Sequence, residues 1–120
     1  MTNTPENLDF ACAKAGQSIV DKKLSKDLEK TLIDALAVLE EQGVYALFLF
    51  LQVKEKDRDI SAELQKFLQN TPKYNPLLKE NGVIFPLLQV MAENLDNLLL
   101  ARDLLRQTLI YARYHAKVNS

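Results

Sequence analysis

Apolar residues recur every three or four positions through most of the chain. Side chains at this spacing lie on one face of an α-helix, so the chain reads as a series of amphipathic helices. No segment alternates apolar and polar residues as a half-buried strand does. The pattern predicts an all-α protein, a compact bundle of five to six helices with a long C-terminal helix, in a single domain spanning residues 1–120. The repeats that carry this prediction are Leu8/Cys12/Ala15/Ile19, Leu28/Leu32/Ala35/Leu36/Leu39, Leu64/Phe67/Leu68, Leu87/Leu88/Val90/Met91 and Leu98/Ala101/Leu105/Leu109/Ala112/Ala116.

Capping residues suggest where these helices begin. Thr4 before Pro5 and Glu6 is a typical start, since proline fits the first helical turn and an acid suits its positive end. Ser25 is expected to cap the second helix, and Asp59 or Ser61 the fourth. Asn94 to Asn97 either interrupts the last apolar stretch or passes directly into the final helix.

Other segments mark breaks or carry conflicting signals. Gly43 is a plausible helix stop, and Gly16 is expected to weaken the first helix. The run 44–53 is rich in β-branched and aromatic residues, but it lacks alternation and has no partner strand, so a buried helix is predicted. The charged stretch 54–59 is expected to be a solvated connection. Asn75-Pro76 is expected to open a short helix through Leu78.

Composition and charge are those of an ordinary globular protein. Of the 120 residues, 48% are hydrophobic and 26% charged, and the net charge is −1. The charge is uneven, because residues 101–120 hold four cations and one acid, a net +3 that leaves −4 for the rest. No secretory signal is recognisable and the longest apolar run has eight residues, too short for a bilayer. We therefore expect a cytoplasmic protein without a membrane partner.

Catalytic and metal-binding patterns are missing from the sequence. Cys12 is the only cysteine and His115 the only histidine, so no thiol or histidine metal constellation is available. The three glycines do not form a phosphate-binding loop. Cys12 is expected to be a small packed thiol. We expect no enzymatic activity, no metal and no cofactor.

A basic stripe in the last helix is the strongest functional feature. Taking Arg102 as zero, Arg106, Arg113 and Lys117 follow at roughly 40°, 20° and 60° around the helix. They form a column about 22 Å long beside the apolar face. Cations suit the end of a helix, which explains Arg113 and Lys117 but not Arg102 and Arg106 near its start. The stripe is either a phosphate-binding surface or an ordinary solvated one.

A second cluster of cations is less specific. Lys22, Lys23, Lys26 and Lys30 are candidate nucleic-acid-binding residues, and Lys26 and Lys30 are spaced to lie side by side on a helix. Acids are interleaved with them, so a salt-bridged surface is at least as good an interpretation.

Three segments resemble a known family. They are Gly43–Phe48, the step Lys79-Glu80-Asn81-Gly82 before an apolar helix, and Tyr111–Lys117 in the closing helix. Over roughly residues 25–118 the chain is similar to the small all-helical subunit of class 1 (type I and type III) CRISPR RNA-guided effector complexes. The resemblance implies a non-enzymatic role. Several copies would stack with other subunits of the complex and contact the backbone of guide RNA, target or displaced strand.

The alternative is a helical protein–protein adaptor. In that interpretation the basic stripe meets an acidic partner protein, and apolar faces make the chain dimerise. The run from Tyr45 to Leu51 is most simply core, but any part of it that reaches the surface would become an interface.

Overall fold

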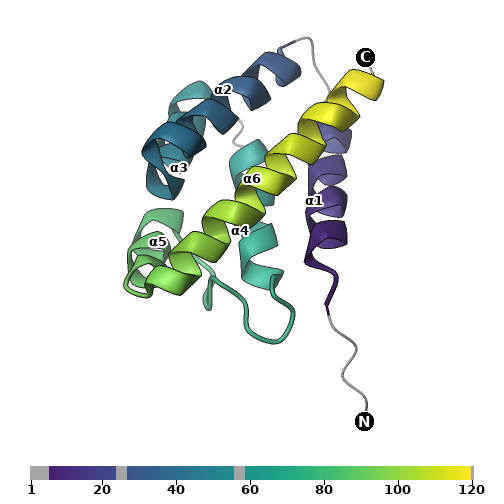
Figure 1. Ribbon diagram of the computed structural model, residues 1–120. Helices are drawn as coiled ribbons and strands as arrows, with labels where there is room; N and C mark the ends of the chain where they lie inside the picture. The colour runs from purple at the N-terminus through teal and green to yellow at the C-terminus, as the bar shows by residue number, and fades with distance from the viewer. Residues whose placement is uncertain (1–5, 24–26, 56–58, 120) are drawn as a thin grey trace.

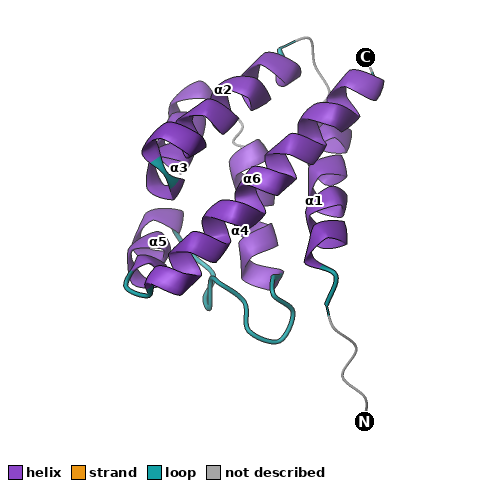
Figure 2. Cartoon of the chain, in the orientation of Figure 1, coloured by secondary structure: helices purple, strands orange, loops and turns teal. Residues whose placement is uncertain are grey.

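The computed structural model describes residues 6–23, 27–55 and 59–119, and every regular element in them is a helix (Figure 2). The elements are α1 (Leu8–Lys23), α2 (Leu28–Gln42), α3 (Val44–Lys54), α4 (Asp59–Asn70), α5 (Ile84–Ala92) and α6 (Leu95–Val118). The prediction of an all-α bundle with a long final helix is confirmed, with six helices in the described part of the chain. None of these helices is both long and apolar enough to cross a membrane.

The long helix α6 organises the bundle. It runs across the front of the molecule with α1 on one side and the α2–α3 pair on the other, while α4 lies behind it (Figure 1). α6 packs on α1, α2, α3 and α5, and its inward face is fully buried. The buried residues of α6 are Ala101, Leu104, Leu105, Thr108, Leu109, Ala112 and Ala116. Burial of this apolar face fixes which edge of α6 is left for solvent.

At Gly16, α1 packs closely against α6. A Cβ atom placed there would lie 2.7 Å from the backbone nitrogen of Ala112 and 2.9 Å from the carbonyl oxygen of Thr108. Glycine therefore lets the backbone of α1 approach the backbone of α6. The sequence reading of Gly16 as a weak point missed this packing role.

Several predicted boundaries are confirmed. Gly43 separates α2 from α3 with φ +99°, a conformation that glycine adopts without strain, and its N–H donates to the carbonyls of Val38 and Leu39. The run 44–53 is helical as predicted, and Leu47, Phe48 and Leu51 are buried. Asn94 interrupts the last stretch and caps α6, because its side chain accepts a hydrogen bond from the N–H of Asn97 at 3.1 Å.

The predicted helix starts are partly wrong. Glu6 and Asn7 are not helical, and the side-chain oxygen of Asn7 accepts the N–H of Phe10 at 2.9 Å, so α1 begins at Leu8. The predicted caps Thr4 and Ser25 lie outside the described residues.

Two connections also differ from expectation. Glu55, read as part of a solvated connection, is buried, and its carboxylate accepts the N–H groups of Ile60 and Ser61 at 3.2 Å each. It therefore caps α4 from outside the helix. The short helix predicted at 75–78 does not form. The N–H groups of Leu77 and Leu78 donate instead to the carbonyls of Thr71 and Leu68 and fold this loop onto α4.

Candidate nucleic-acid interface

The four cations of the basic stripe (Arg102, Arg106, Arg113 and Lys117) lie on one continuous helix. α6 extends from Leu95 to Val118 without a break, so the helical spacing predicted for the stripe holds along its full length. Arg106, Arg113 and Lys117 are exposed and Arg102 is partly exposed. The buried side of α6 faces the core, and the stripe follows its flank.

Glu40 of α2 engages the N-terminal half of the stripe. Arg106 donates from Nε to Oε1 of Glu40, and Nη2 of Arg102 donates to the backbone carbonyl of Glu40 at 3.3 Å. Nη2 of Arg102 also lies 3.9 Å from Oε2 of Glu40. Two guanidinium groups therefore share one carboxylate, and one positive charge is left in excess.

These ion pairs are accessible to solvent. The side chains of Arg102, Arg106 and Glu40 are 44%, 51% and 39% exposed. Pairs in such surroundings contribute about 0–1 kcal/mol each, since water screens the charges and the long side chains lose freedom. The pairing orients the two arginines without removing them from the surface.

The C-terminal half of the stripe is different. Arg113 is exposed and makes no salt bridge with the described residues, and Lys117 is exposed one turn further along. Tyr114 beside them is also exposed. This half of α6 presents cations and an aromatic ring together.

Tyr111 is held on the other flank of α6. Its hydroxyl donates to the carboxylate of Asp9 in α1, with distances of 2.8 and 2.9 Å to the two oxygens. This hydrogen bond, with further contributions from desolvation and the charge of Asp9, raises the pKa of Tyr111 above its ordinary value. Tyr111 is therefore a residue at the edge of the core that ties α1 to α6.

Two lysines of the second cluster make separate ion pairs with acids. Lys22 lies 2.6 Å from the buried carboxylate of Glu63 in α4, and Lys30 lies 3.1 Å from Asp34 within α2. Lys23 ends α1, and Lys26 lies outside the described residues. The alternative of a salt-bridged surface accounts for Lys22 and Lys30. The pairing with Glu63 was not foreseen, because nothing in the sequence places α4 beside α1.

An apolar row on α3 also reaches the surface. Tyr45, Leu49 and Val53 follow one another at intervals of four residues and are exposed, Val53 to 89%. The ring of Tyr45 contacts that of Phe85 in α5, with centroids 5.2 Å apart. The sequence treats this run chiefly as core, but its helical spacing assigns Tyr45, Leu49 and Val53 to the face opposite Leu47, Phe48 and Leu51. That spacing is the signal that could have found the row.

No metal site is formed by histidine, cysteine and carboxylate groups in residues 6–23, 27–55 and 59–119. Cys12 is buried and unpaired by any disulfide, as expected for a packed thiol. Comparison with known proteins gives no match to a family model, a curated protein or a solved structure.

Proposed function

We propose that the protein is a non-enzymatic small subunit of a multisubunit CRISPR effector complex. In this role copies of the chain stack beside other subunits and contact guide RNA with target or displaced strand. The basic stripe on α6 supplies the contacts. The single observation that carries the proposal is the alignment of Arg102, Arg106, Arg113 and Lys117 along one exposed flank of an unbroken helix.

The dimensions of the stripe suit a phosphate backbone. From Arg102 to Lys117 the helix rises about 22 Å at 1.5 Å per residue. One strand of a duplex presents a phosphate every 3.4 Å of axis, so the stripe passes about six of them. Contacts to phosphates position a protein without reading sequence, and in a guided complex base pairing supplies the sequence information. A helix with no base-reading pocket is sufficient for this task.

Glu40 lowers the affinity that we expect for nucleic acid. A phosphate that binds Arg102 and Arg106 must share them with Glu40 or displace it, and the exposed pairs cost little to open. The chain as a whole carries a net charge of −1, which opposes long-range attraction of a polyanion. An isolated copy should therefore bind weakly, and stacking several copies along one strand should strengthen binding through multivalency.

The experiment is a salt titration of binding to a single-stranded oligonucleotide, followed by fluorescence anisotropy. With three to four phosphates neutralised, the slope of log K against log salt should be about −2 to −3. Reversal of charge in Arg113→Glu should lower affinity and reduce the slope by about one phosphate contact. Lys54→Glu changes the net charge equally at an exposed position of α3, so it is the matched control.

The decisive version of this test uses the assembled complex. Retention of nucleic acid by a complex that carries Arg106→Glu and Arg113→Glu should fall while helicity measured by circular dichroism is unchanged. Unaltered retention would refute the proposal.

A second candidate function, the helical adaptor, is favoured by the apolar row on α3. Three apolar side chains in line on an exposed helix face are typical of a protein-binding surface. In that case Leu49→Glu would abolish partner binding. Charge reversal in α6 would change mainly the association rate of the partner and the salt dependence of binding.

A further inference from the structure

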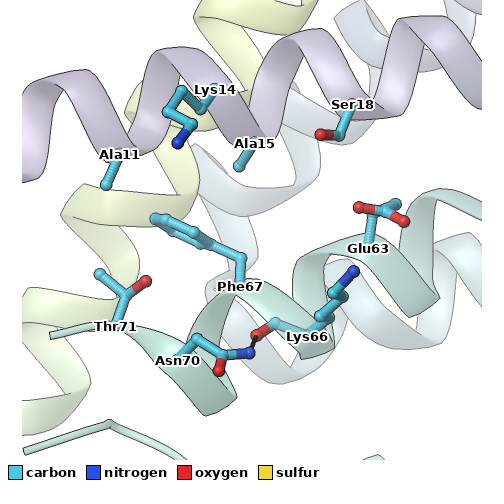
Figure 3. Close-up of a pocket in the computed structure, with 9 residues that line it drawn as sticks. All are labelled: Ala11, Lys14, Ala15, Ser18, Glu63, Lys66, Phe67, Asn70 and Thr71. Carbon is cyan, nitrogen blue, oxygen red and sulfur yellow. Dashed lines mark hydrogen bonds between the residues drawn. The ribbon is translucent and has the colours of Figure 1, made fainter. Parts of the chain in front are cut away.

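A groove of about 410 Å³ lies between α1 and α4, away from the basic stripe (Figure 3). Ala11 and Ala15 of α1 form one wall, and the ring of Phe67 from α4 extends across the groove toward them. The two helices pack on each other, but the short alanine side chains leave space that the aromatic ring does not fill. A volume of this size is in the range of small-molecule sites.

The polar lining of this groove is positively charged. Lys14 of α1 and Lys66 of α4 line it, and neither makes a salt bridge with the described residues. The ammonium of Lys14 lies 5.7 Å from the centroid of the Phe10 ring. The one acid in the lining, Glu63, is buried and held by Lys22 at 2.6 Å. The groove therefore offers two cations to a ligand and no unpaired carboxylate to repel an anion.

A threonine hydroxyl is the third element of the groove. Thr71 is only 5% exposed, and its hydroxyl is directed toward the ring of Phe67 (Figure 3). It takes part in none of the side-chain hydrogen bonds found among the described residues. The hydroxyl can therefore donate a hydrogen bond to a ligand oxygen in the groove.

We propose that this groove binds a small organic anion with an apolar body, such as an aromatic phosphate or carboxylate. The head group interacts with Lys14 and Lys66 and accepts a hydrogen bond from Thr71, and the body lies on Ala11, Ala15 and Phe67. Both halves of the ligand are required, because exposed ammonium groups alone bind an anion weakly and the alanine–phenylalanine wall alone does not select for charge. The site is independent of nucleic-acid binding through α6.

The test uses phenyl phosphate and the full chain, labelled with ¹⁵N for NMR titration. Amide shifts should be confined to 11–18 and 63–71, and they should saturate. Lys14→Gln and Lys66→Gln should each weaken binding at least threefold, and Thr71→Val should weaken it without a change in charge. Lys54→Gln, with the same loss of charge on α3, should have no effect. Benzyl alcohol, which has the same ring without the charge, should bind at least tenfold more weakly.

Three results would overturn the proposal. Inorganic phosphate giving the same shifts at the same concentration would mean that the lysines act only as exposed charges. Shifts centred on α6 would place the anion at the basic stripe. An acidic peptide that saturates the groove where phenyl phosphate does not would assign it to a protein partner. The Lys→Gln exchanges lie at exposed positions, so the fold should be retained, and circular dichroism would verify this.

Discussion

The carboxylate of Glu40 accepts a hydrogen bond from Arg106, a residue 66 positions away in the sequence. The contact joins α2 to α6 at the point where the basic stripe begins. It makes one acid of the same chain a competitor for any anion that approaches Arg102 and Arg106.

Replacing this acid should strengthen nucleic-acid binding. Glu40→Gln removes the competing charge and should raise the affinity for a single-stranded oligonucleotide severalfold, with at most about 1 kcal/mol lost in stability. Glu41→Gln is the matched control, since the neighbouring Glu41 is exposed and makes no salt bridge with the described residues. Anisotropy titrations should show a higher affinity for the oligonucleotide in Glu40→Gln than in Glu41→Gln. Equal gains would mean that only overall charge matters, and that the contact with Arg106 is irrelevant.

The close approach of α1 and α6 makes Gly16→Ala destabilising. Alanine is favoured over glycine in a helix by about 1 kcal/mol, but here its methyl group would meet the backbone of Ala112 at 2.7 Å. Overpacking typically costs about 1–3 kcal/mol and outweighs the gain in helix propensity, so we expect a net loss of about 1 kcal/mol in the free energy of unfolding measured with urea. Gln17→Ala, at the next and exposed position, should change stability by less than about 0.5 kcal/mol. A stabilised Gly16→Ala variant would show that the helices can move apart at no cost.

Thr108→Val should stabilise the protein. Thr108 is completely buried, and its hydroxyl oxygen has no hydrogen-bond partner within the described part of the chain. Valine keeps the shape and removes the polar group, which should add about 1 kcal/mol to the free energy of unfolding. Thermal and urea unfolding would measure the change. A clear loss of stability would indicate that the hydroxyl is satisfied, either by a buried water molecule or by the neighbouring thiol of Cys12.

Stability should fall at alkaline pH through Tyr111. The hydrogen bond to Asp9 raises the pKa of Tyr111 in the folded state, so the folded protein holds this proton more tightly than the unfolded chain does. This contribution is complete below the ordinary tyrosine value near 10 and is lost as pH rises through the higher folded-state value. The difference in stability between the native protein and Tyr111→Phe should therefore narrow with pH in that range. A difference in stability that stays constant with pH would show that the hydrogen bond between Tyr111 and Asp9 does not cause the alkaline loss of stability.

Periodicity predicts the helices of this chain well and their ends less well. The spacing of Leu105, Leu109 and Ala112 indicates directly which face of α6 is buried, because burial on one side of a helix imposes the 3.6-residue repeat. The ends of the helices are harder to predict, because they depend on capping hydrogen bonds that several residue types can supply. Asn7 serves α1 where Thr4 was expected, and Glu55 reaches α4 from four residues before it.

The candidate interface was predictable only in part. Helical geometry places the four cations on one flank of α6 from the sequence alone. It cannot reveal that Glu40 of α2 lies beside Arg102 and Arg106, since that contact depends on how two distant helices pack. The groove between α1 and α4 is hidden for the same reason. Lys14 and Lys66 have no relation in sequence until tertiary packing brings their helices together.

The principal packing partner of α1 is a helix whose synthesis begins only some seventy residues later. As the chain leaves the ribosome, the parts of α1 and α2 that pack on α6 stay uncovered until α6 clears the exit tunnel. Contacts between residues so far apart in the sequence slow the folding of a helical protein, compared with a bundle in which helices pack on their neighbours in sequence. In the cell, this interval is when the nascent chain has most need of a chaperone.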